Sequence, residues 1–494
     1  MTSRKKGMRL VAGAGVGAAA AAALRRRWAG RRGVEAPRVP EPGSPGDVYL
    51  EHLAAAVRIP TISHEDRSLT DPAPFDAFHA FLEDTYPRVH RNLNREVVAG
   101  HALLYTWEGA DPGAPAVLLM GHIDVVGIEP GTEDGWEHPP FAGERDEEWL
   151  WGRGTTDDKG SVVAIFEAVE GLLAEGFRPD VTLLLAVGDD EEIGGGRGAA
   201  AISALLSSRE VSLDFVLDEG GAVVTGLLPG VTRPVALVGI GEKGYLNVEL
   251  VAEGAGGHSS VPPPHTAVGA LAAAVARLEA TPLAVRLDSQ EGFFAALAPV
   301  LGGVNGLALR HADRLGPLVE RRLSASPPGN ALIRTTTAVT MIEGGVKPNV
   351  LPQSARAVVN FRVIPGDTVE GVLEHVRRVV GEEITVRQLP GGFSAEPSPL
   401  SSTDSAAYRV VAESIAAVFP EATVAPWIVM GATDARHYLP VASAAYRFSP
   451  FRMTPADLGR MHGTGERLSL SDADGALAFY RTVIQKACGT TQQW

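Results

Sequence analysis

The sequence predicts an α/β fold: a mostly parallel sheet with helices on both faces, interrupted by an inserted α+β domain. Three short apolar runs, at 116–120, 181–187 and 213–217, each end at a cluster of polar residues. Continuous apolar strands of this kind are buried on both faces, as in parallel sheets. From about residue 238, apolar and polar residues alternate instead. This alternation is typical of half-exposed antiparallel strands and indicates a second, differently built domain.

Helices are predicted between these strands. Residues 161–173 carry apolar side chains at helical spacing, namely Val162, Ile165, Phe166, Val169 and Leu172. The second domain is expected to hold strands at 246–250, 335–341 and 355–363 and helices at 266–278 and 368–380. Helix 403–419, strand 441–448 and helix 472–487 return to the first style. The predicted division is therefore 1–46 (tail and Pro/Gly linker), 47–237, 238–388 (insertion) and 389–494.

The stretch 281–333 fits neither style well. Its apolar residues Phe293, Phe294, Leu297, Val300 and Leu301 indicate one helix face. Packing into a core is the favoured interpretation, and an apolar wall for a lipophilic substrate is the alternative.

Composition excludes some classes of protein. The 494 residues are enough for two or three domains. The net charge is −15, and because the first 34 residues hold nine Lys/Arg and no acid, the remainder carries −24. Nucleic-acid binding needs basic surface and is not expected. Cys488 is the one cysteine, so an intrachain disulfide and a cysteine-based metal site are both excluded.

The N-terminus leaves two interpretations open. Four basic residues precede an uncharged run at 10–24, and five arginines follow it. A disordered basic tail on a cytoplasmic enzyme is slightly favoured. An uncleaved membrane anchor or export signal is the alternative, although the run is short and only mildly apolar.

The first two polar clusters contain metal-ligand types. His122 and Asp124 are two apart in an extended segment, so both face one side, where the carboxylate can orient the imidazole. Asp157 and Asp158 follow the glycine-rich segment 152–154, and one carboxylate can bridge two cations. Taken singly, these motifs also fit an ordinary strand end and a helix N-terminus.

Three further clusters complete the set. Glu191 and Glu192 belong to four consecutive carboxylates, which repel one another unless cations neutralise them. Asp218 closes a buried strand, where an unpaired charge is costly. His462 lies far along the chain. Together, two histidines and three carboxylates fit two zinc sites that share one aspartate and produce hydroxide near neutral pH. Adjacent Glu side chains point differently, so one of the two can bind metal while the other faces the bound water as general base.

These motifs, in this order, resemble the co-catalytic zinc exopeptidase family of carboxypeptidase S, glutamate carboxypeptidase and aminoacylase. The blocks that carry the resemblance are GHIDVV, GRGTTDDKG, DDEEIGG, LDEGG, GGHSS, GGVKPNVLP and MGATDAR, between residues 47 and 488. The carboxypeptidase S and N-fatty-acyl-amino-acid hydrolase branch is the most similar. The resemblance implies a zinc exopeptidase catalytic domain and a lid/dimerisation domain.

The resemblance also implies roles for individual residues. His122, Asp157 and Asp218 would hold one metal, and Asp157, Glu192 and His462 the other. Some relatives have Glu where Asp218 stands. Asp124 would orient His122, and Glu191 would act as general base and acid.

The insertion would add substrate contacts. His258 matches a histidine that stabilises the oxyanion in the partner subunit's site, and Asn349 matches a lid residue near the substrate. Arg362 and Arg436 are candidates to bind the substrate carboxylate, with a structural ion pair as the alternative for Arg436.

The expected activity is hydrolysis of the amide bond in peptides or N-acyl amino acids with a free carboxylate. The expected cofactors are two Zn²⁺ per chain, with Co²⁺ or Mn²⁺ as substitutes. We expect a homodimer through the lid, no nucleic-acid partner, and membrane association only if the N-terminus is an anchor. The alternatives are a deacylase of an intermediate such as acetylornithine or succinyl-diaminopimelate, and a non-catalytic metal-binding dimer.

Overall fold

A computed structural model of the whole chain describes residues 38–226 and 230–489. Its central sheet has ten strands in the order β1-β2-β6-β3-β7-β18-β9-β8-β19, with β17 paired to β9. The strands are β1 Asn94–Val98, β2 Ala102–Trp107, β3 Ala116–His122, β6 Leu183–Gly188, β7 Leu213–Asp218, β8 Val223–Val224, β9 Val235–Glu242, β17 Thr423–Val429, β18 Ala445–Arg447 and β19 Arg452–Met453. The central neighbours β6, β3, β7 and β18 run parallel, as predicted.

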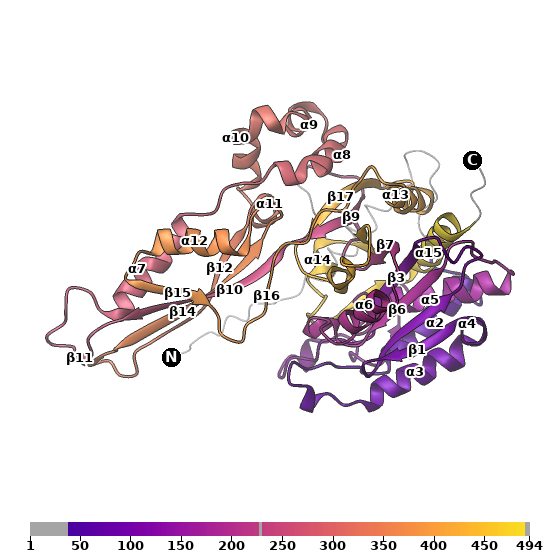
Figure 1. Cartoon of the computed structure of the whole chain (residues 1–494), viewed down its shortest axis with the longest axis horizontal. Helices are drawn as coiled ribbons and strands as arrows, with labels where there is room; N and C mark the ends of the chain where they lie inside the picture. The colour runs from indigo at the N-terminus through magenta and orange to yellow at the C-terminus, as the bar shows by residue number, and fades with distance from the viewer. Residues whose placement is uncertain (1–37, 227–229, 490–494) are drawn as a thin grey trace, which may run out of the picture.

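Helices cover both faces of this sheet (Figure 1). On β6, Leu183 and Leu185 join one core, whereas Leu184 and Ala186 join another, because successive strand residues point to opposite faces. The first core includes α2 Pro45–Val57, α3 Ala73–Thr85, α4 Pro87–Asn92, α5 Lys159–Ala174, α13 Ala406–Val418 and α15 Ala473–Cys488. The second includes α6 Ala199–Ser208. The predicted α/β class is confirmed.

A small sheet and a short helix complete this part of the molecule. The sheet joins β4 Glu144–Arg145, β5 Trp149–Trp151 and β20 Arg467–Ser469 in the order β20-β5-β4. The helix, α14 Pro455–Leu458, has Thr454 and Asp457 as a reciprocal capping box. The sheet brings residues near 150 beside residues near 467, and so draws two of the predicted site motifs together.

A second, antiparallel sheet forms what we call the inserted unit. Its order is β12-β14-β10-β15, with β16 also paired to β10. The strands are β10 Gly244–Glu253, β12 Thr336–Gly344, β14 Ser354–Val363, β15 Ile384–Gln388 and β16 Ser394–Ala395. Helices α7 Ala267–Ala280 and α12 Val369–Val380 pack on it around an apolar core. Each of these helices begins after a threonine whose side chain accepts a hydrogen bond from a backbone N–H, as N-caps do.

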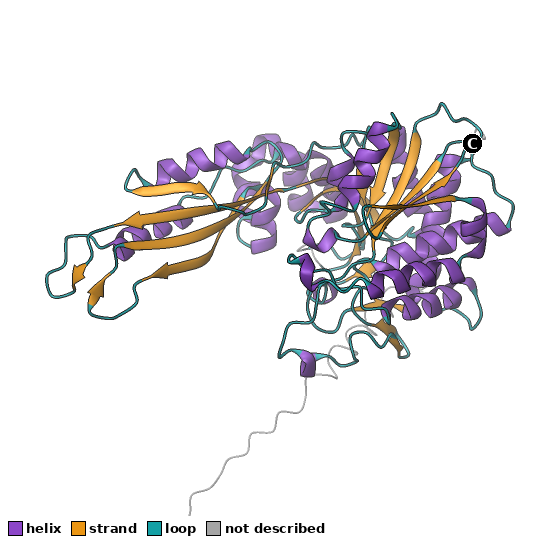
Figure 2. Ribbon diagram, turned by 60° about the horizontal axis from the view of Figure 1, so that its bottom comes forward, coloured by secondary structure: helices purple, strands orange, loops and turns teal. Residues whose placement is uncertain are grey.

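The inserted unit extends away from the central sheet as a long arm (Figures 1 and 2). Its tip is a two-stranded sheet of β11 Gly257–His258 and β13 Val350–Leu351. At its other end, β10 follows β9 with one residue, Lys243, between them. The boundary expected near residue 238 therefore falls inside β9, a strand of the central sheet.

Residues 288–333 form helices that belong to the first core. They are α8 Glu291–Leu301, α9 Gly303–Arg310, α10 Ala312–Leu323 and α11 Pro327–Ile333. Phe293, Phe294 and Leu297 are at most 3% exposed, and the Phe293 ring lies 5.3 Å from the Trp427 ring of β17. Core packing is therefore confirmed for these residues, and they do not form the alternative substrate wall.

No helix within residues 38–226 and 230–489 combines the length and the apolar character that a bilayer span requires. The uncharged run at 10–24, on which the anchor interpretation depends, lies outside the described residues.

Candidate active site built from clustered metal ligands

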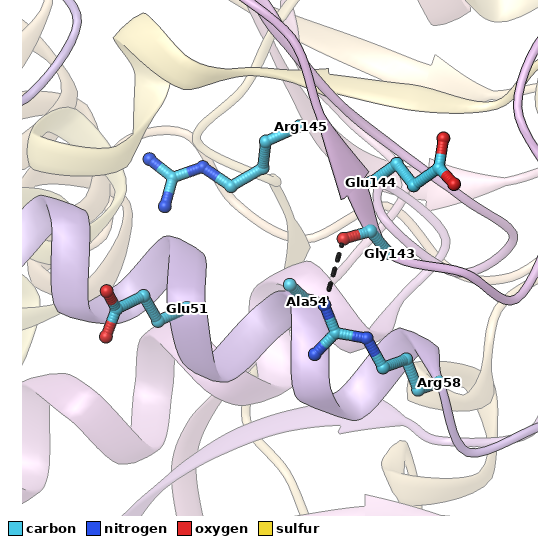
Figure 3. A pocket seen from close by; sticks show the side chains of 6 residues that line it. All are labelled: Glu51, Ala54, Arg58, Gly143, Glu144 and Arg145. Atoms are coloured by element: carbon cyan, nitrogen blue, oxygen red, sulfur yellow. Dashed lines mark hydrogen bonds between the residues drawn. The ribbon is translucent and has the colours of Figure 1, made fainter.

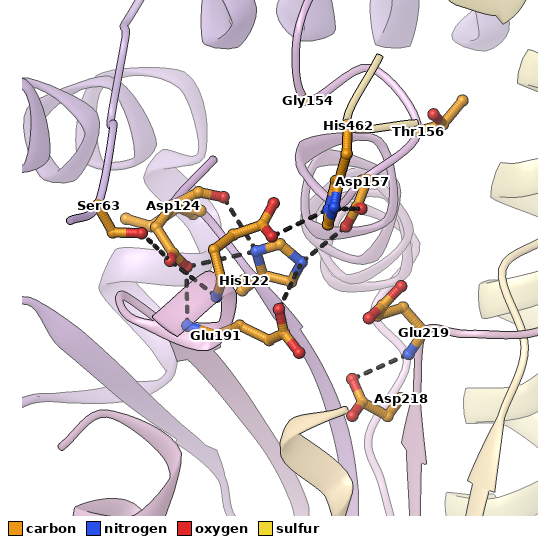
Figure 4. Close-up of polar contacts among 12 residues, drawn as sticks. Ser63, His122, Asp124, Gly154, Thr156, Asp157, Glu191, Asp218, Glu219 and His462 are labelled. Carbon is orange, nitrogen blue, oxygen red and sulfur yellow. Dashed lines mark hydrogen bonds and ion pairs between the residues drawn. The ribbon is translucent and has the colours of Figure 1, made fainter. Parts of the chain in front are cut away.

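Strand ends of the central sheet and the loops beside them bring most of the predicted ligands together (Figure 4). His122 is the last residue of β3 and is 1% exposed. Its Nε2 lies 3.0 Å from Oδ1 of Asp157, and its Nδ1 lies 3.0 Å from the backbone carbonyl of Asp124. The Asp124 carboxylate is 3.4 Å from the same nitrogen. Contacts of this kind on one ring nitrogen fix the other as the metal-binding atom.

Asp157 lies between the two histidines. Its second oxygen, Oδ2, is 3.0 Å from Nε2 of His462. His462 Nε2 is also 3.0 Å from Oε2 of Glu192. A carboxylate that faces one imidazole with each oxygen has the geometry of a bridging ligand.

Two ligand groups share Asp157. His122, Asp157 and Glu219 offer ligand atoms within 4.8 Å of one another, and so do Asp157, Glu192 and His462. The residue that reaches the first group from the end of β7 is Glu219, where Asp218 was expected. The Asp218 carboxylate instead accepts hydrogen bonds from the backbone N–H groups of Glu219 and Ala435, at 2.9 and 2.7 Å.

The Glu191–Glu192 turn is held by Asp124. The Asp124 carboxylate accepts the backbone N–H groups of Glu191 and Glu192, each at 3.1 Å, and the hydroxyl of Ser63 at 2.7 Å. Asp124 thus fixes His122 and both glutamates at once. Ser63 was not foreseen, because it lies 61 residues before Asp124 in an irregular segment.

Glu191 has the surroundings of a proton carrier. Its carboxylate approaches His122 Nε2 no closer than 4.0 Å. Burial, together with the carboxylates of Asp434 and Asp157, raises its pKa well above the usual range. A buried carboxyl group of raised pKa can accept a proton and return it near neutral pH.

The buried carboxylates of the cluster would be stabilised by bound cations. Burial also raises the pKa of Glu192 and Glu219, whereas hydrogen bonds from His122 and His462 outweigh burial and lower that of Asp157. The Oε1 atom of Glu192 is buried without a hydrogen-bond partner. Carboxylates and imidazoles crowded in this way fit zinc, which takes both kinds of ligand.

Contacts of the Glu466 side chain fix the loop that carries Asp157. Glu466 is 1% exposed, and it accepts hydrogen bonds from the backbone N–H groups of Gly154, Thr156 and Asp157 and from the Arg153 guanidinium. Glu466 stands in the same sequence block as His462, so one segment supplies both a candidate ligand and the anchor of the neighbouring loop. The Asp157–Asp158 peptide bond is cis.

The two predicted arginines have no carboxylate partner among the described residues. The Arg362 guanidinium, on β14, lies 4.6 Å from the centre of the Tyr245 ring, and burial lowers its pKa. Arg436 donates to the Gly194 carbonyl at 2.7 Å and lies over the Phe393 ring. The structural ion pair considered for Arg436 is therefore not formed within the described chain.

His258 and Asn349 lie elsewhere, together at the tip of the inserted unit. The Asn349 carbonyl accepts the backbone N–H of Ser259, and both His258 and Asn349 are exposed. Figures 1 and 2 show this tip far from the strand ends of the same chain. A surface pocket between α2 and β4, lined by Glu51, Ala54, Arg58, Gly143, Glu144 and Arg145, contains none of the predicted residues (Figure 3).

Comparisons with known proteins find relatives that match most of this chain. The chain is 38% identical to the probable carboxypeptidase S-like 2 of Dictyostelium discoideum, over 89% of this chain and 85% of that protein. It is 39% identical to the N-fatty-acyl-amino acid synthase/hydrolase PM20D1 of Mus musculus, over 88% and 87%. The predicted branch is confirmed.

Solved structures share the fold. The M20 family metallo-carboxypeptidase Sso-CP2 from Sulfolobus solfataricus superposes with a TM-score of 0.63 at 19% identity, covering 88% of this chain and 98% of that one. Human carnosine dipeptidase 1 gives 0.61 at 16%, covering 90% and 96%. The model of Peptidase family M20/M25/M40 matches residues 118–486, which contain all five ligand-bearing motifs. The chain therefore belongs to this metal-dependent peptidase family and is a hydrolase that acts on carbon–nitrogen bonds.

Proposed function

We propose that this enzyme hydrolyses the amide bond of peptides or N-acyl amino acids whose carboxylate is free. The observation that carries the proposal is the position of Asp157, with one carboxylate oxygen 3.0 Å from His122 and the other 3.0 Å from His462. The names of the relatives, carboxypeptidase S and N-fatty-acyl-amino acid synthase/hydrolase, support this substrate class over a biosynthetic deacylase.

Two divalent ions fit the cluster, with zinc preferred and Co²⁺ or Mn²⁺ as substitutes. His122, Asp157 and Glu219 would hold one, and Asp157, Glu192 and His462 the other. We thus place Glu219 in the role first expected for Asp218. When bound, such a pair of ions polarises the scissile carbonyl and lowers the pKa of water.

Glu191 moves the proton. Its raised pKa, and the 4.0 Å that separates its carboxylate from His122 Nε2, suit a carboxylate that takes a proton from the attacking water and delivers it to the departing nitrogen. Asp124 keeps this group in position, because it holds the backbone on both sides of the Glu191 side chain.

Arg362 is the proposed carboxylate binder. It projects from β14 beside Tyr245, and no acidic residue of the described chain neutralises it. An unpaired, half-buried guanidinium can bind a carboxylate with two hydrogen bonds. Arg436 would act beside it, from the loop that contacts Gly194.

A second subunit would complete the site. We infer that the inserted unit serves as lid and dimer interface. β12 is the free edge of its sheet and exposes Met341 and Ile342, and Val346 nearby is 91% exposed. Free edges with apolar side chains pair with other chains. The His258 of the partner subunit would then stabilise the oxyanion, with Asn349 close to the substrate.

The proposal is tested by matched substrates. N-acetyl and long-chain N-acyl amino acids and dipeptides are compared with the same compounds as C-terminal amides. We expect hydrolysis of the free acids and a loss of kcat/KM for the amides, because the amide cannot pair with Arg362. In the Arg362→Gln variant, the difference in kcat/KM between free acids and amides should be smaller than in the wild type. Equal hydrolysis of acids and amides by the wild type would contradict the carboxylate requirement.

A further inference from the structure

A second cluster of metal-ligand side chains lies outside the catalytic cluster. Asp76 and His79 stand three residues apart on α3, so they share one helix face. His101 lies in the turn between β1 and β2 and faces them. The three residues offer ligand atoms within 4.8 Å of one another.

One pair of these atoms has the spacing of two ligands on a tetrahedral ion. Nδ1 of His101 lies 3.4 Å from Oδ1 of Asp76. Ligands bound to zinc at about 2.0–2.1 Å in tetrahedral geometry are about 3.3–3.4 Å apart. An ion could therefore enter between these two atoms with little rearrangement.

The imidazoles are held in place by other contacts. Nε2 of His79 lies 2.8 Å from the His101 carbonyl, and if it donates this bond, Nδ1 carries the lone pair. The His101 ring also packs against Phe75, with ring centres 5.3 Å apart. Burial lowers the pKa of His79, which favours the neutral ring that a metal requires.

We propose that Asp76, His79 and His101 form a further binding site for a divalent transition-metal ion, separate from the catalytic pair. Two imidazoles and one carboxylate suit zinc and its neighbours in the first transition row. The fourth position would face solvent, because Asp76 is largely exposed.

The site adjoins the strand end that carries the catalytic glutamates. The backbone N–H of His101 donates to Oδ2 of Asp189 at 3.2 Å, and Asp189 precedes Glu191 by two residues. An ion here would tie α3 to the β1–β2 turn and stabilise the contact of that turn with the end of β6.

The test is a zinc titration of the full-length enzyme, followed by calorimetry and elemental analysis. We expect the wild type to bind one more zinc per chain than His101→Ala. The catalytic ions are common to both proteins, so this difference does not depend on how many ions the catalytic cluster holds. Asp76→Asn removes a direct ligand, so it should weaken zinc binding at the extra site by at least the roughly tenfold that loss of an outer-shell contact costs.

His138→Ala is the matched control. His138 also lies beside a carboxylate, with Nδ1 2.6 Å from Glu144, but it belongs to none of the ligand groups in the described residues. It should keep the full zinc number. His101→Ala keeps the backbone N–H that holds Asp189, so basal activity reports that it has folded.

A thermal measurement adds a second readout. Excess zinc should raise the Tm of the wild type and of His138→Ala more than that of His101→Ala. If His101→Ala does not fold, Asp76→Asn provides the test instead. The Asp76 side chain is 72% exposed, so its replacement should not disturb folding. Equal zinc binding by the wild type, His101→Ala and Asp76→Asn would overturn the proposal. The contact between His101 and Asp76 would then be an ion pair at the surface without a metal.

Discussion

Asp124 shows how one buried carboxylate can arrange a whole site. It contacts His122 and accepts hydrogen bonds from the backbone N–H groups of Glu191 and Glu192 and from the hydroxyl of Ser63. The HxD spacing in the sequence predicted its place beside His122. The bonds to the glutamate turn could not be predicted, because they depend on how β3 and β6 lie side by side.

Glu191→Gln is the sharpest test of the proton carrier. The amide is nearly isosteric but cannot accept a proton, so kcat should fall roughly 10²–10⁴-fold while metal content stays unchanged. Steady-state kinetics and elemental analysis measure both quantities. Glu137→Gln, an exposed glutamate, serves as control and should behave as wild type. Near-normal turnover by Glu191→Gln would remove Glu191 from the mechanism.

The metal content of the Asp218→Asn and Glu219→Gln variants distinguishes which of the two carboxylates is the ligand. Glu219→Gln should lose about one of the two ions after dialysis, because it removes a charged ligand. Asp218→Asn should keep both ions, since Asp218 accepts backbone N–H groups and lies outside the ligand groups. The reverse pattern would restore Asp218 as the ligand. Sequence could not decide this point, because the Ala435 N–H that holds Asp218 comes from 217 residues further on.

At the scale of elements, distant segments make the site rigid. The small β20-β5-β4 sheet brings Glu466 to the loop that precedes α5, where it meets Arg153 at 2.8 Å. Strand and helix positions were predicted well where the pattern was local, as for α5, α7 and α12. The apolar helix face expected around Phe293 is α8, and its Phe293 ring packs against Trp427 of β17. Helices α9–α11 were not predicted, because they pack mainly on one another and on α8.

Arg153→Met tests this rigidity. Removing one partner of a buried ion pair leaves the other unneutralised, which costs about 3–5 kcal/mol of unfolding free energy. We expect that loss in denaturant titrations, together with weaker metal retention. Arg145→Met is the matched control: its pair with Asp47 has the same 2.8 Å spacing but is more exposed, so its loss should cost about 0–1 kcal/mol. Similar losses in the two variants would mean that Glu466 does not anchor the loop.

In the whole molecule, the expected catalytic residue His258 lies far from the metal-ligand cluster of the same chain (Figure 1). His258 lies at the tip of the inserted unit, and the family resemblance predicted that it acts in the partner subunit. The sequence predicted the fold class and the family, but the length of the arm could be seen only in three dimensions.

Mixing two inactive variants tests sharing between subunits. His258→Ala and Glu191→Gln each supply what the other lacks, so random re-pairing of equal amounts should restore about a quarter of wild-type activity. Adding Ile342→Glu to both chains places a charge on the edge strand β12 and should abolish the recovery. Sedimentation should then show monomers. Recovery that survives without dimers, or no recovery in mixed dimers, would exclude the in-trans role.

The junction of the inserted unit has a mechanical consequence. β9 continues into β10 across Lys243, whose ammonium donates to the carbonyls of Ala331 and Arg334 at 2.5 and 2.8 Å. The first strand of the arm is thus an extension of the central sheet, and its base is braced from the side by α11. Because the strand path is continuous and its base is held, we expect a displacement of the tip to be transmitted to the central sheet.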